Sequence, residues 1–186
     1  MKITDAYSKV WLDIIRQPTI KKSLYWANSQ NEGRTKEFLK RFKDLKNLKI
    51  LELGGGAGNF GTRLLNNPEI NIKTYTFADH QRTLSFISDK TLKDLRVKTV
   101  RAHQIEKLRI NKFDVVVSIN CLSETTTIFR EYLYKNIFPN CKNLFVIDGG
   151  KEFKEEFKIK LNEIFTNVQI LPWEERPGRK LYIASN

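Results

Sequence analysis

The chain has 186 residues, of which 40% are hydrophobic and 29% are charged. This length suits one domain with a substantial core and leaves no room for a second, substrate-binding domain. The composition excludes a disordered chain, and no apolar run approaches the roughly 18 residues that a membrane-spanning helix needs. Residues 1–17 include Asp5 and Asp13 and lack a small-residue cleavage site, so they do not predict a signal peptide. We therefore expect a cytoplasmic protein.

The formal net charge of +12 raises the question of a nucleic-acid partner. The positive charge is mostly lysine, however, and it is mixed with glutamate, as in Lys36-Glu37. This pattern favours a solvated, lysine-rich surface. It is also compatible with a small-molecule acceptor that is anionic, such as a nucleotide-linked sugar. Cys121 and Cys141 have no C-x-x-C spacing, so we expect reduced buried thiols and no metal site.

The first third of the chain predicts two helices, because apolar residues recur at helical spacing around residues 10–15 and 38–45. Residues 25–34, between them, are rich in aromatic and amide side chains. They predict either a lid over a ligand or a capped interhelical loop. We assign residues 1–48 to N-terminal helices with a candidate substrate lid.

From residue 49 onward, strand-like and helical segments alternate, which predicts a parallel sheet with helices on both faces. Residues 113–120 are almost continuously apolar, as in a strand covered on both sides. The predicted strands are 49–53, 73–78, 97–102, 113–120 and 144–148, and the predicted helices are 58–65, 86–95, 128–138 and 151–165.

The last two strand-like runs, 167–171 and 180–184, are joined by only eight residues. Parallel neighbours need a connection of about a dozen residues or more, so this pair predicts an antiparallel hairpin. The expected fold class is α/β, with a seven-stranded, mostly parallel sheet that ends in this hairpin. Residues 49–186 would form the core.

A glycine loop follows the first strand, with Glu52 before Gly54, Gly56 and Gly58. Missing side chains let backbone N–H groups approach a ligand, and glycine permits positive φ in a tight turn. A carboxylate at the strand end suits a cationic ligand or a loop amide better than a pyrophosphate.

This acidic-x-Gly-x-Gly-x-Gly pattern resembles the cofactor loop of the class I S-adenosylmethionine methyltransferases. Their Rossmann-like seven-stranded architecture is similar to the sheet expected here. The resemblance implies an S-adenosylmethionine cofactor held by Glu52 and by Gly54, Gly55, Gly56 and Gly58. A rival remains open, because residues 56–61 also match the G-x-G-x-x-G dinucleotide motif, with an acid, Asp79, at the expected distance.

Asp79 ends the second predicted strand, where a carboxylate can accept hydrogen bonds from ribose hydroxyls. The alternative is a helix N-cap. After the third strand, many methyltransferases have an acid that binds the adenine amino group, whereas this chain has His103, Gln104 and Ile105. His103 or Gln104 could accept from adenine and Ile105 could pack on the purine, although an ordinary loop explains these residues equally well.

The fourth predicted strand leads to Asn120 and then Glu124. This exit lacks the Asn-Pro-Pro-Tyr signature of amino-group methylation, so the acceptor is expected to be a hydroxyl, with Glu124 or His80 as general base. Glu124 could instead be a first-turn helix acid. Asn120 is a candidate cofactor contact, and Asp148 is a third carboxylate at this edge. Asp114 starts its strand at the opposite edge of the sheet, so we expect it to have a structural role.

A larger part of the chain, about residues 49–148, resembles the sugar O-methyltransferases. The residues that carry this resemblance are 51–56, Asp79, 118–124 and Tyr132-Leu133. The resemblance implies O-methylation of a sugar or another small polar metabolite. An RNA methyltransferase, an NAD(P)-binding protein and a noncatalytic cofactor-binding module remain as alternatives.

Overall fold

The computed structural model of the chain describes residues 6–17, 31–149, 151–174 and 176–186. They form one seven-stranded sheet in the order β3-β2-β1-β4-β5-β7-β6. The strands are β1 (Leu48–Leu53), β2 (Ile72–Asp79), β3 (Val97–Arg101), β4 (Phe113–Ile119), β5 (Cys141–Gly149), β6 (Asn167–Pro172) and β7 (Arg179–Ser185).

Strands β1 to β5 run parallel, and β7 runs antiparallel to both β5 and β6. The pairing of Gly149 with Arg179 places the start of β7 beside the end of β5. The predicted sheet and hairpin are confirmed. The physical cause is the short β6–β7 connection, which cannot cross over the sheet.

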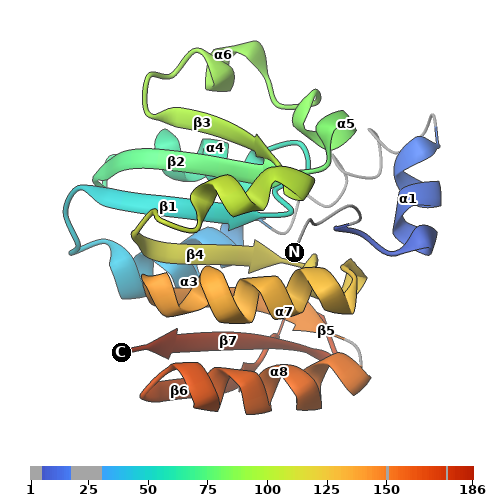
Figure 1. Cartoon of the computed structure of the whole chain (residues 1–186). Helices are drawn as coiled ribbons and strands as arrows, with labels where there is room; N and C mark the ends of the chain where they lie inside the picture. The colour runs from blue at the N-terminus through green and yellow to red at the C-terminus, as the bar shows by residue number, and fades with distance from the viewer. Residues whose placement is uncertain (1–5, 18–30, 150, 175) are drawn as a thin grey trace.

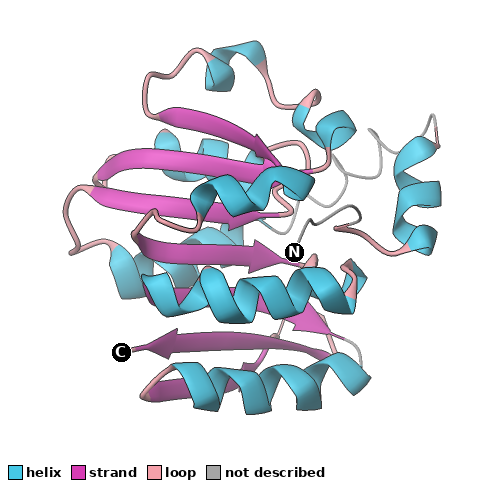
Figure 2. Ribbon diagram, in the orientation of Figure 1, coloured by secondary structure: helices cyan, strands magenta, loops and turns pink. Residues whose placement is uncertain are grey.

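Helices cover both faces of the sheet (Figures 1 and 2). The front face in Figure 1 carries the 3-10 helix η2 (Ala102–Leu108) with α7 (Thr127–Asn136) and α8 (Lys151–Ile164), and the back face carries α3 (Asn31–Phe42) and α4 (Asn59–Leu65). Successive side chains of β4 point to opposite faces of the sheet and so contribute to two hydrophobic cores. Val116 packs with the front helices, while Val115 and Val117 pack with the back ones.

The carboxyl ends of β1 to β4 point toward α1 (Lys9–Arg16), at the right of Figure 1. The short helix α5 (Gln81–Leu84) follows β2 on the same side. Loops that leave parallel strands in the same direction meet at one edge, so this carboxyl edge gathers the residues from the glycine loop, β2 and β4.

The helix predicted over residues 86–95 is present but shorter, as the four-residue helix α6 (Asp89–Leu92). The four-residue helix α5 precedes it, outside the predicted range. Ser88 separates them, since its side-chain oxygen accepts from the Thr91 amide at 3.2 Å and begins a new helix. The other elements predicted from residue 49 onward agree with the structure to within about three residues at their ends, whereas α3 begins seven residues before the predicted range 38–45.

The candidate lid at residues 25–34 lies mostly outside the described residues. Its last four residues, from Asn31, are the first turn of α3, where Asn31 and Arg34 are buried. The second helix therefore begins inside the segment predicted as a lid or interhelical loop.

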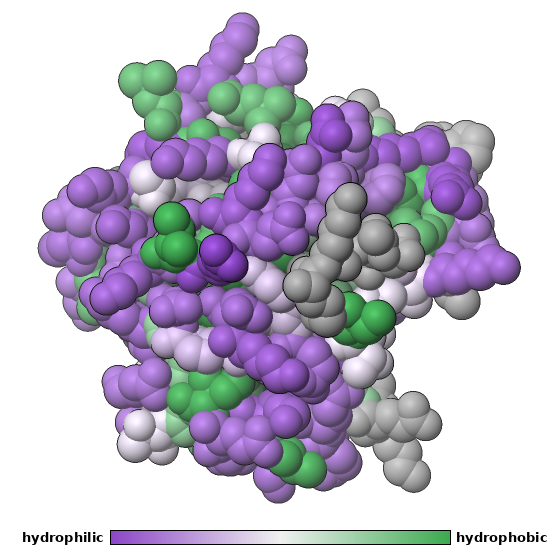
Figure 3. All heavy atoms as spheres, viewed as in Figure 1, coloured by the Kyte–Doolittle hydropathy of each residue, from purple (hydrophilic) through white to green (hydrophobic). Residues whose placement is uncertain are grey.

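No helix in the described ranges is long and apolar enough to cross a bilayer. The face in Figure 3 is mostly hydrophilic, with small separate hydrophobic patches. Cys121 and Cys141 are both free and buried, as predicted.

Candidate functional site

The glycine loop turns sharply where β1 ends. Gly54, Gly56 and Gly58 have φ values of +71°, +57° and +74°, which confirms the expected left-handed turn. A Cβ on Gly54 would lie 2.2 Å from Cys121 Sγ, so the loop packs directly against the β4 exit. Glycine is required at position 54 by both conformation and space.

Glu52 lies inside the protein rather than at the surface of the loop. It is 2% exposed, and its Oε2 accepts a hydrogen bond from the Tyr75 hydroxyl at 2.8 Å. Burial raises the pKa of Glu52 to about 7, although Tyr75 and the Gly61 amide favour its charged form. This geometry favours the loop-amide interpretation of Glu52 over direct contact with a ligand.

Asp79 joins β2 to the glycine loop. It is 3% exposed, and its Oδ2 accepts from the Gly56 amide at 2.7 Å. The other oxygen, Oδ1, accepts from the Tyr7 hydroxyl at 2.6 Å and from the His80 amide. The glycine loop and the β2 carboxylate therefore lie together, as the sequence predicted, but with an additional partner from the N-terminus.

That partner belongs to a segment that we call the N-terminal strap, residues Ala6, Tyr7 and Ser8. Tyr7 forms a β-bridge with Thr125, and the Ser8 amide donates to the Glu124 carbonyl at 3.0 Å. The strap thus connects the end of β2 with the β4 exit. The sequence carried no signal for Tyr7, because the contact joins residues 72 positions apart.

His80 contributes to local structure. Its Nδ1 accepts from the Arg82 amide at 3.2 Å and caps α5, so the cap is His80 rather than Asp79. Burial lowers the pKa of His80. The capping bond occupies one ring nitrogen, which leaves only the other for a ligand.

A small cavity of about 220 Å³ lies beside the strap. Its lining comes from the strap, α1, His80 and the start of η2, with the residues Ala6, Tyr7, Leu12, Arg16, His80, Ala102 and His103. His103 therefore lies where a ligand could reach it, and half-buried Gln104 follows it. Ile105 is 0% exposed within the core, so the prediction that it packs on a purine is wrong.

Asn120, at the end of β4, has an unusual backbone with φ of +54°. Its amide donates to the Ile147 carbonyl at 2.7 Å, while its side-chain Oδ1 is buried and has no partner among the described residues. A buried acceptor without a donor is costly, and strained backbone gathers at ligand sites. Asn120 is therefore a strong candidate for a ligand contact.

Glu124 is half-buried, and its carboxylate forms no hydrogen bond or ion pair with another described residue. Burial, and then the charge of Asp148, raise the pKa of Glu124. The side chain of Thr126 caps α7 by accepting from the Phe129 amide at 3.2 Å. Glu124 therefore lies before the first turn of α7, at the end of the 3-10 helix η3 (Leu122–Glu124).

Asp148 is committed to structure. It is fully buried and accepts from the Ser123 hydroxyl at 2.6 Å, from the Ser123 amide and from the Gly149 amide. Half-buried Arg179 lies next to it, with its Cγ over Gly149, and is the cation that acts on Glu124. Sequence reasoning missed Arg179.

Asp114 lies at the opposite edge of the sheet, where it accepts from the Lys49 amide at 2.9 Å and pairs with Lys142 at 2.8 Å. The structural role predicted for it is confirmed. Within the described ranges, no three His, Cys, Asp or Glu side chains gather in a way that could hold a metal ion.

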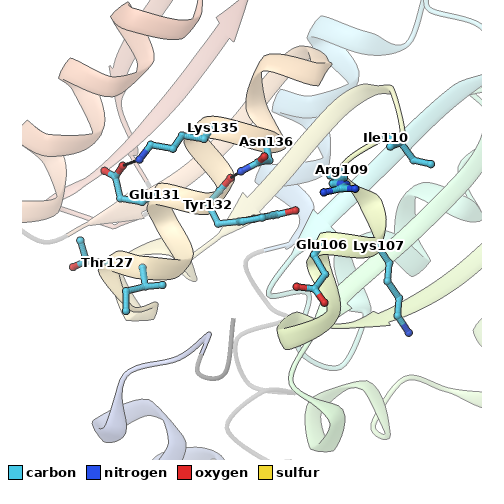
Figure 4. Close-up of a pocket in the computed structure, with 10 residues that line it drawn as sticks. Glu106, Lys107, Arg109, Ile110, Thr127, Glu131, Tyr132, Lys135 and Asn136 are labelled. Atoms are coloured by element: carbon cyan, nitrogen blue, oxygen red, sulfur yellow. Dashed lines mark hydrogen bonds and ion pairs between the residues drawn. The ribbon is translucent and has the colours of Figure 1, made fainter. Parts of the chain in front are cut away.

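A hollow of about 930 Å³ is a surface groove between η2 and α7 (Figure 4). Tyr132 points from α7 toward Arg109 across it, whereas Glu131 is turned toward Lys135 and pairs with it at 3.3 Å. None of the residues that line it comes from the glycine loop or the strand ends, so its size does not make it the reaction site.

No protein-family model matches the sequence, and no curated protein matches it either. Solved structures do match. The structures that match this seven-stranded fold are methyltransferases. The chain has the methyltransferase fold.

Three similar structures indicate the range of methyltransferases that share this fold. The methyltransferase domain of bacterial CtHen1 matches with a TM-score of 0.64 and 14% identity, over 84% of this chain and 99% of that domain. The pyocyanin biosynthetic protein PhzM matches with a TM-score of 0.66 and 14% identity, over 96% of this chain and 62% of that one. Human N-acetylserotonin methyltransferase, in complex with SAM, matches with a TM-score of 0.67 and 14% identity, over 96% of this chain and 59% of that one. This chain thus spans about three fifths of the last two.

Proposed function

We propose that the protein is an S-adenosylmethionine-dependent methyltransferase that acts on a hydroxyl of a sugar or another small polar metabolite. The observation that carries this proposal is the 2.7 Å bond between the Gly56 amide and Asp79, within the methyltransferase fold. It puts a loop without side chains and a strand-end carboxylate at one place, which suits the donors of a nucleoside.

The residues at this edge fit the cofactor chemically. The Asp79 carboxylate accepts hydroxyl donors, and the buried Oδ1 of Asn120 needs a donor that the described residues do not supply. The loop from Gly54 to Gly58 would hold the cofactor, and His103 would lie near its base. Glu52 would support the loop from inside through Tyr75. When bound, the cofactor supplies a methyl group on a sulfonium.

Glu124 would accept the proton of the acceptor hydroxyl, because its carboxylate is half-buried and unpaired with described residues. Placing the hydroxyl in line with the methyl group is the main task, and such positioning can supply roughly 7 to 11 kcal/mol. His80 is a weaker candidate for the base, because capping occupies its Nδ1.

The acceptor is proposed to be small, since the N-terminal strap crosses the carboxyl edge beside Glu124. Arg179, whose positive charge acts on Glu124, favours an acceptor that carries a negative group. These observations support a small anionic or polar compound over RNA, although the net charge of +12 suits either.

Calorimetric titration with S-adenosylmethionine, S-adenosylhomocysteine and NAD tests the cofactor. We expect the first two to bind and NAD not to bind. Preferential binding of NAD would favour a nicotinamide enzyme, and binding of none of the three would overturn the proposed function.

The acceptor is tested by methyl transfer from labelled S-adenosylmethionine to a panel of neutral sugars, phosphorylated sugars, nucleotide-linked sugars and RNA. We expect label in the sugar arms. Label found in RNA alone would replace the proposed acceptor by a nucleic acid.

A further inference from the structure

The N-terminal strap suggests how entry to the proposed cofactor site is controlled. We propose that the Tyr7 hydroxyl occupies the place on Asp79 that a ribose hydroxyl takes, so that the strap must leave Asp79 before the cofactor can bind. This inference rests on the proposed function, and it makes Tyr7 a built-in competitor that sets cofactor affinity.

The hydrogen-bonding capacity of Asp79 is the first argument. A carboxylate has about four acceptor positions. The Gly56 and His80 amides take one on each oxygen, and Tyr7 takes a second on Oδ1. One position remains, on Oδ2. A ribose diol brings two donors, so one present donor must leave.

Tyr7 is the donor that can leave. The two amides belong to the glycine loop and to the residue directly after β2, and both are fixed by the sheet edge. Tyr7 contacts Asp79 through its side chain alone. The backbone of the strap is bonded to the β4 exit and not to β2, through the Tyr7 bridge to Thr125, Ser8 to the Glu124 carbonyl at 3.0 Å and Thr126 to the Ala6 carbonyl at 3.1 Å, so the Tyr7 side chain can leave Asp79 while these contacts remain.

Space is the second argument. Tyr7 is 4% exposed, with its ring 6.4 Å from the His80 ring and its hydroxyl 3.9 Å from Cys121 Sγ. The cavity left beside it is about 220 Å³. Ligand pockets usually measure roughly 300 to 1,000 Å³, so the present cavity is too small for the cofactor while Tyr7 fills this position.

The protonation state of Tyr7 agrees with its role as a competing hydrogen-bond donor. Burial raises the pKa of Tyr7 well above its ordinary value, with the charge of Asp79 acting in the same direction. The phenol therefore stays protonated and donates to the carboxylate, as a ribose hydroxyl would.

The first test is calorimetric titration of S-adenosylhomocysteine into Tyr7→Phe. Removing the hydroxyl removes the competitor, so affinity should rise about tenfold, since a hydrogen bond to a charged group of this kind is broken in the wild type on binding. Unchanged or weaker binding would overturn the proposal, and weaker binding would indicate that Tyr7 contacts the cofactor instead.

Tyr134→Phe is the matched control. Its hydroxyl also donates to a carboxylate, Glu156, at 3.1 Å, but it lies on α7 away from the glycine loop. It should leave S-adenosylhomocysteine affinity unchanged. If the wild type and both variants bind neither S-adenosylhomocysteine nor S-adenosylmethionine, the proposed function itself has failed.

The second test needs no cofactor. Cys121 is 5% exposed and lies against Tyr7, so alkylation of its thiol reports opening of the strap. Tyr7→Phe should raise the iodoacetamide reaction rate of Cys121 severalfold, measured by mass spectrometry. Cys141, bonded to the Phe138 carbonyl at 3.2 Å, is the internal control and should not change. An unchanged Cys121 rate would show that the Tyr7 hydroxyl does not hold the strap in place.

Discussion

The two ends of the carboxyl edge differ in how far the protein satisfies its own polar groups. At the β1–β2 end, Glu52 is bonded to Tyr75, and Asp79 to Gly56 and Tyr7. At the β4–β5 end, the Asn120 Oδ1 and the Glu124 carboxylate have no partners among the described residues. The chain thus satisfies the polar groups of the β1–β2 end, whereas the β4–β5 end, where Asp148 is bonded to Ser123, still has two acceptors without a partner among the described residues.

The largest effect is expected where the two ends meet. Gly54→Ala should lower the free energy of unfolding by about 3 to 4 kcal/mol, because its φ is +71° and its Cβ would overlap Cys121 Sγ. Gly178→Ala is the matched control, since φ is +88° there but nothing lies within 4 Å of the added Cβ. It should cost about 1 kcal/mol. Equal losses in urea unfolding would mean that the loop does not pack tightly on the β4 exit.

The burial of Glu52 predicts a pH-dependent stability. Its pKa rises from 4.5 in the unfolded chain to about 7 in the folded one. Between these values the folded chain binds more protons, so the free energy of unfolding falls as pH rises through this window. Glu52→Gln removes this titration, which is worth about 3 kcal/mol.

The measurement is urea unfolding of both proteins at about pH 4 and about pH 8. The variant should gain stability relative to the wild type at the higher pH, because an amide oxygen still accepts from Tyr75. Parallel pH profiles would mean that Glu52 is not held in the buried position described here.

At the β4–β5 end, Glu124→Gln should lower turnover about a hundredfold or more, as loss of a general base does, while cofactor affinity stays nearly constant. The wild-type rate should rise with pH through an apparent pKa above the ordinary glutamate value, since burial raises the pKa of Glu124. Glu131→Gln, a carboxylate paired with Lys135 on α7, is the control. Wild-type turnover in Glu124→Gln would remove Glu124 from the reaction.

The smallest expected effect concerns cofactor binding by Asp79, at the β1–β2 end. Asp79→Asn should weaken S-adenosylhomocysteine binding at least about tenfold, because an amide cannot accept from donors on both of its atoms. Asp114→Asn changes a carboxylate at the opposite edge of the sheet and should leave binding intact. Titration calorimetry compares them, and equal affinities would place the cofactor elsewhere.

Local pattern was sufficient for most of the fold. The period of apolar residues located the strands, and the eight-residue gap before the last of them required an antiparallel hairpin. The pattern overestimated the helix at residues 86–95, where the Ser88 cap begins a helix of only four residues. It also failed at Ile105, because nothing in a single residue type distinguishes a core side chain from one that faces a ligand.

The sequence by itself determined the sheet, its hairpin and the glycine loop with an acid behind each of the first two strands, since these depend on residues close together along the chain. Only the tertiary structure decided which carboxylates are satisfied and which are open. Tyr7 reaches Asp79 across 72 residues, and Arg179 reaches the edge near Glu124 through the antiparallel pairing of β7 with β5. Such contacts arise when distant segments pack together, and no local spacing encodes them.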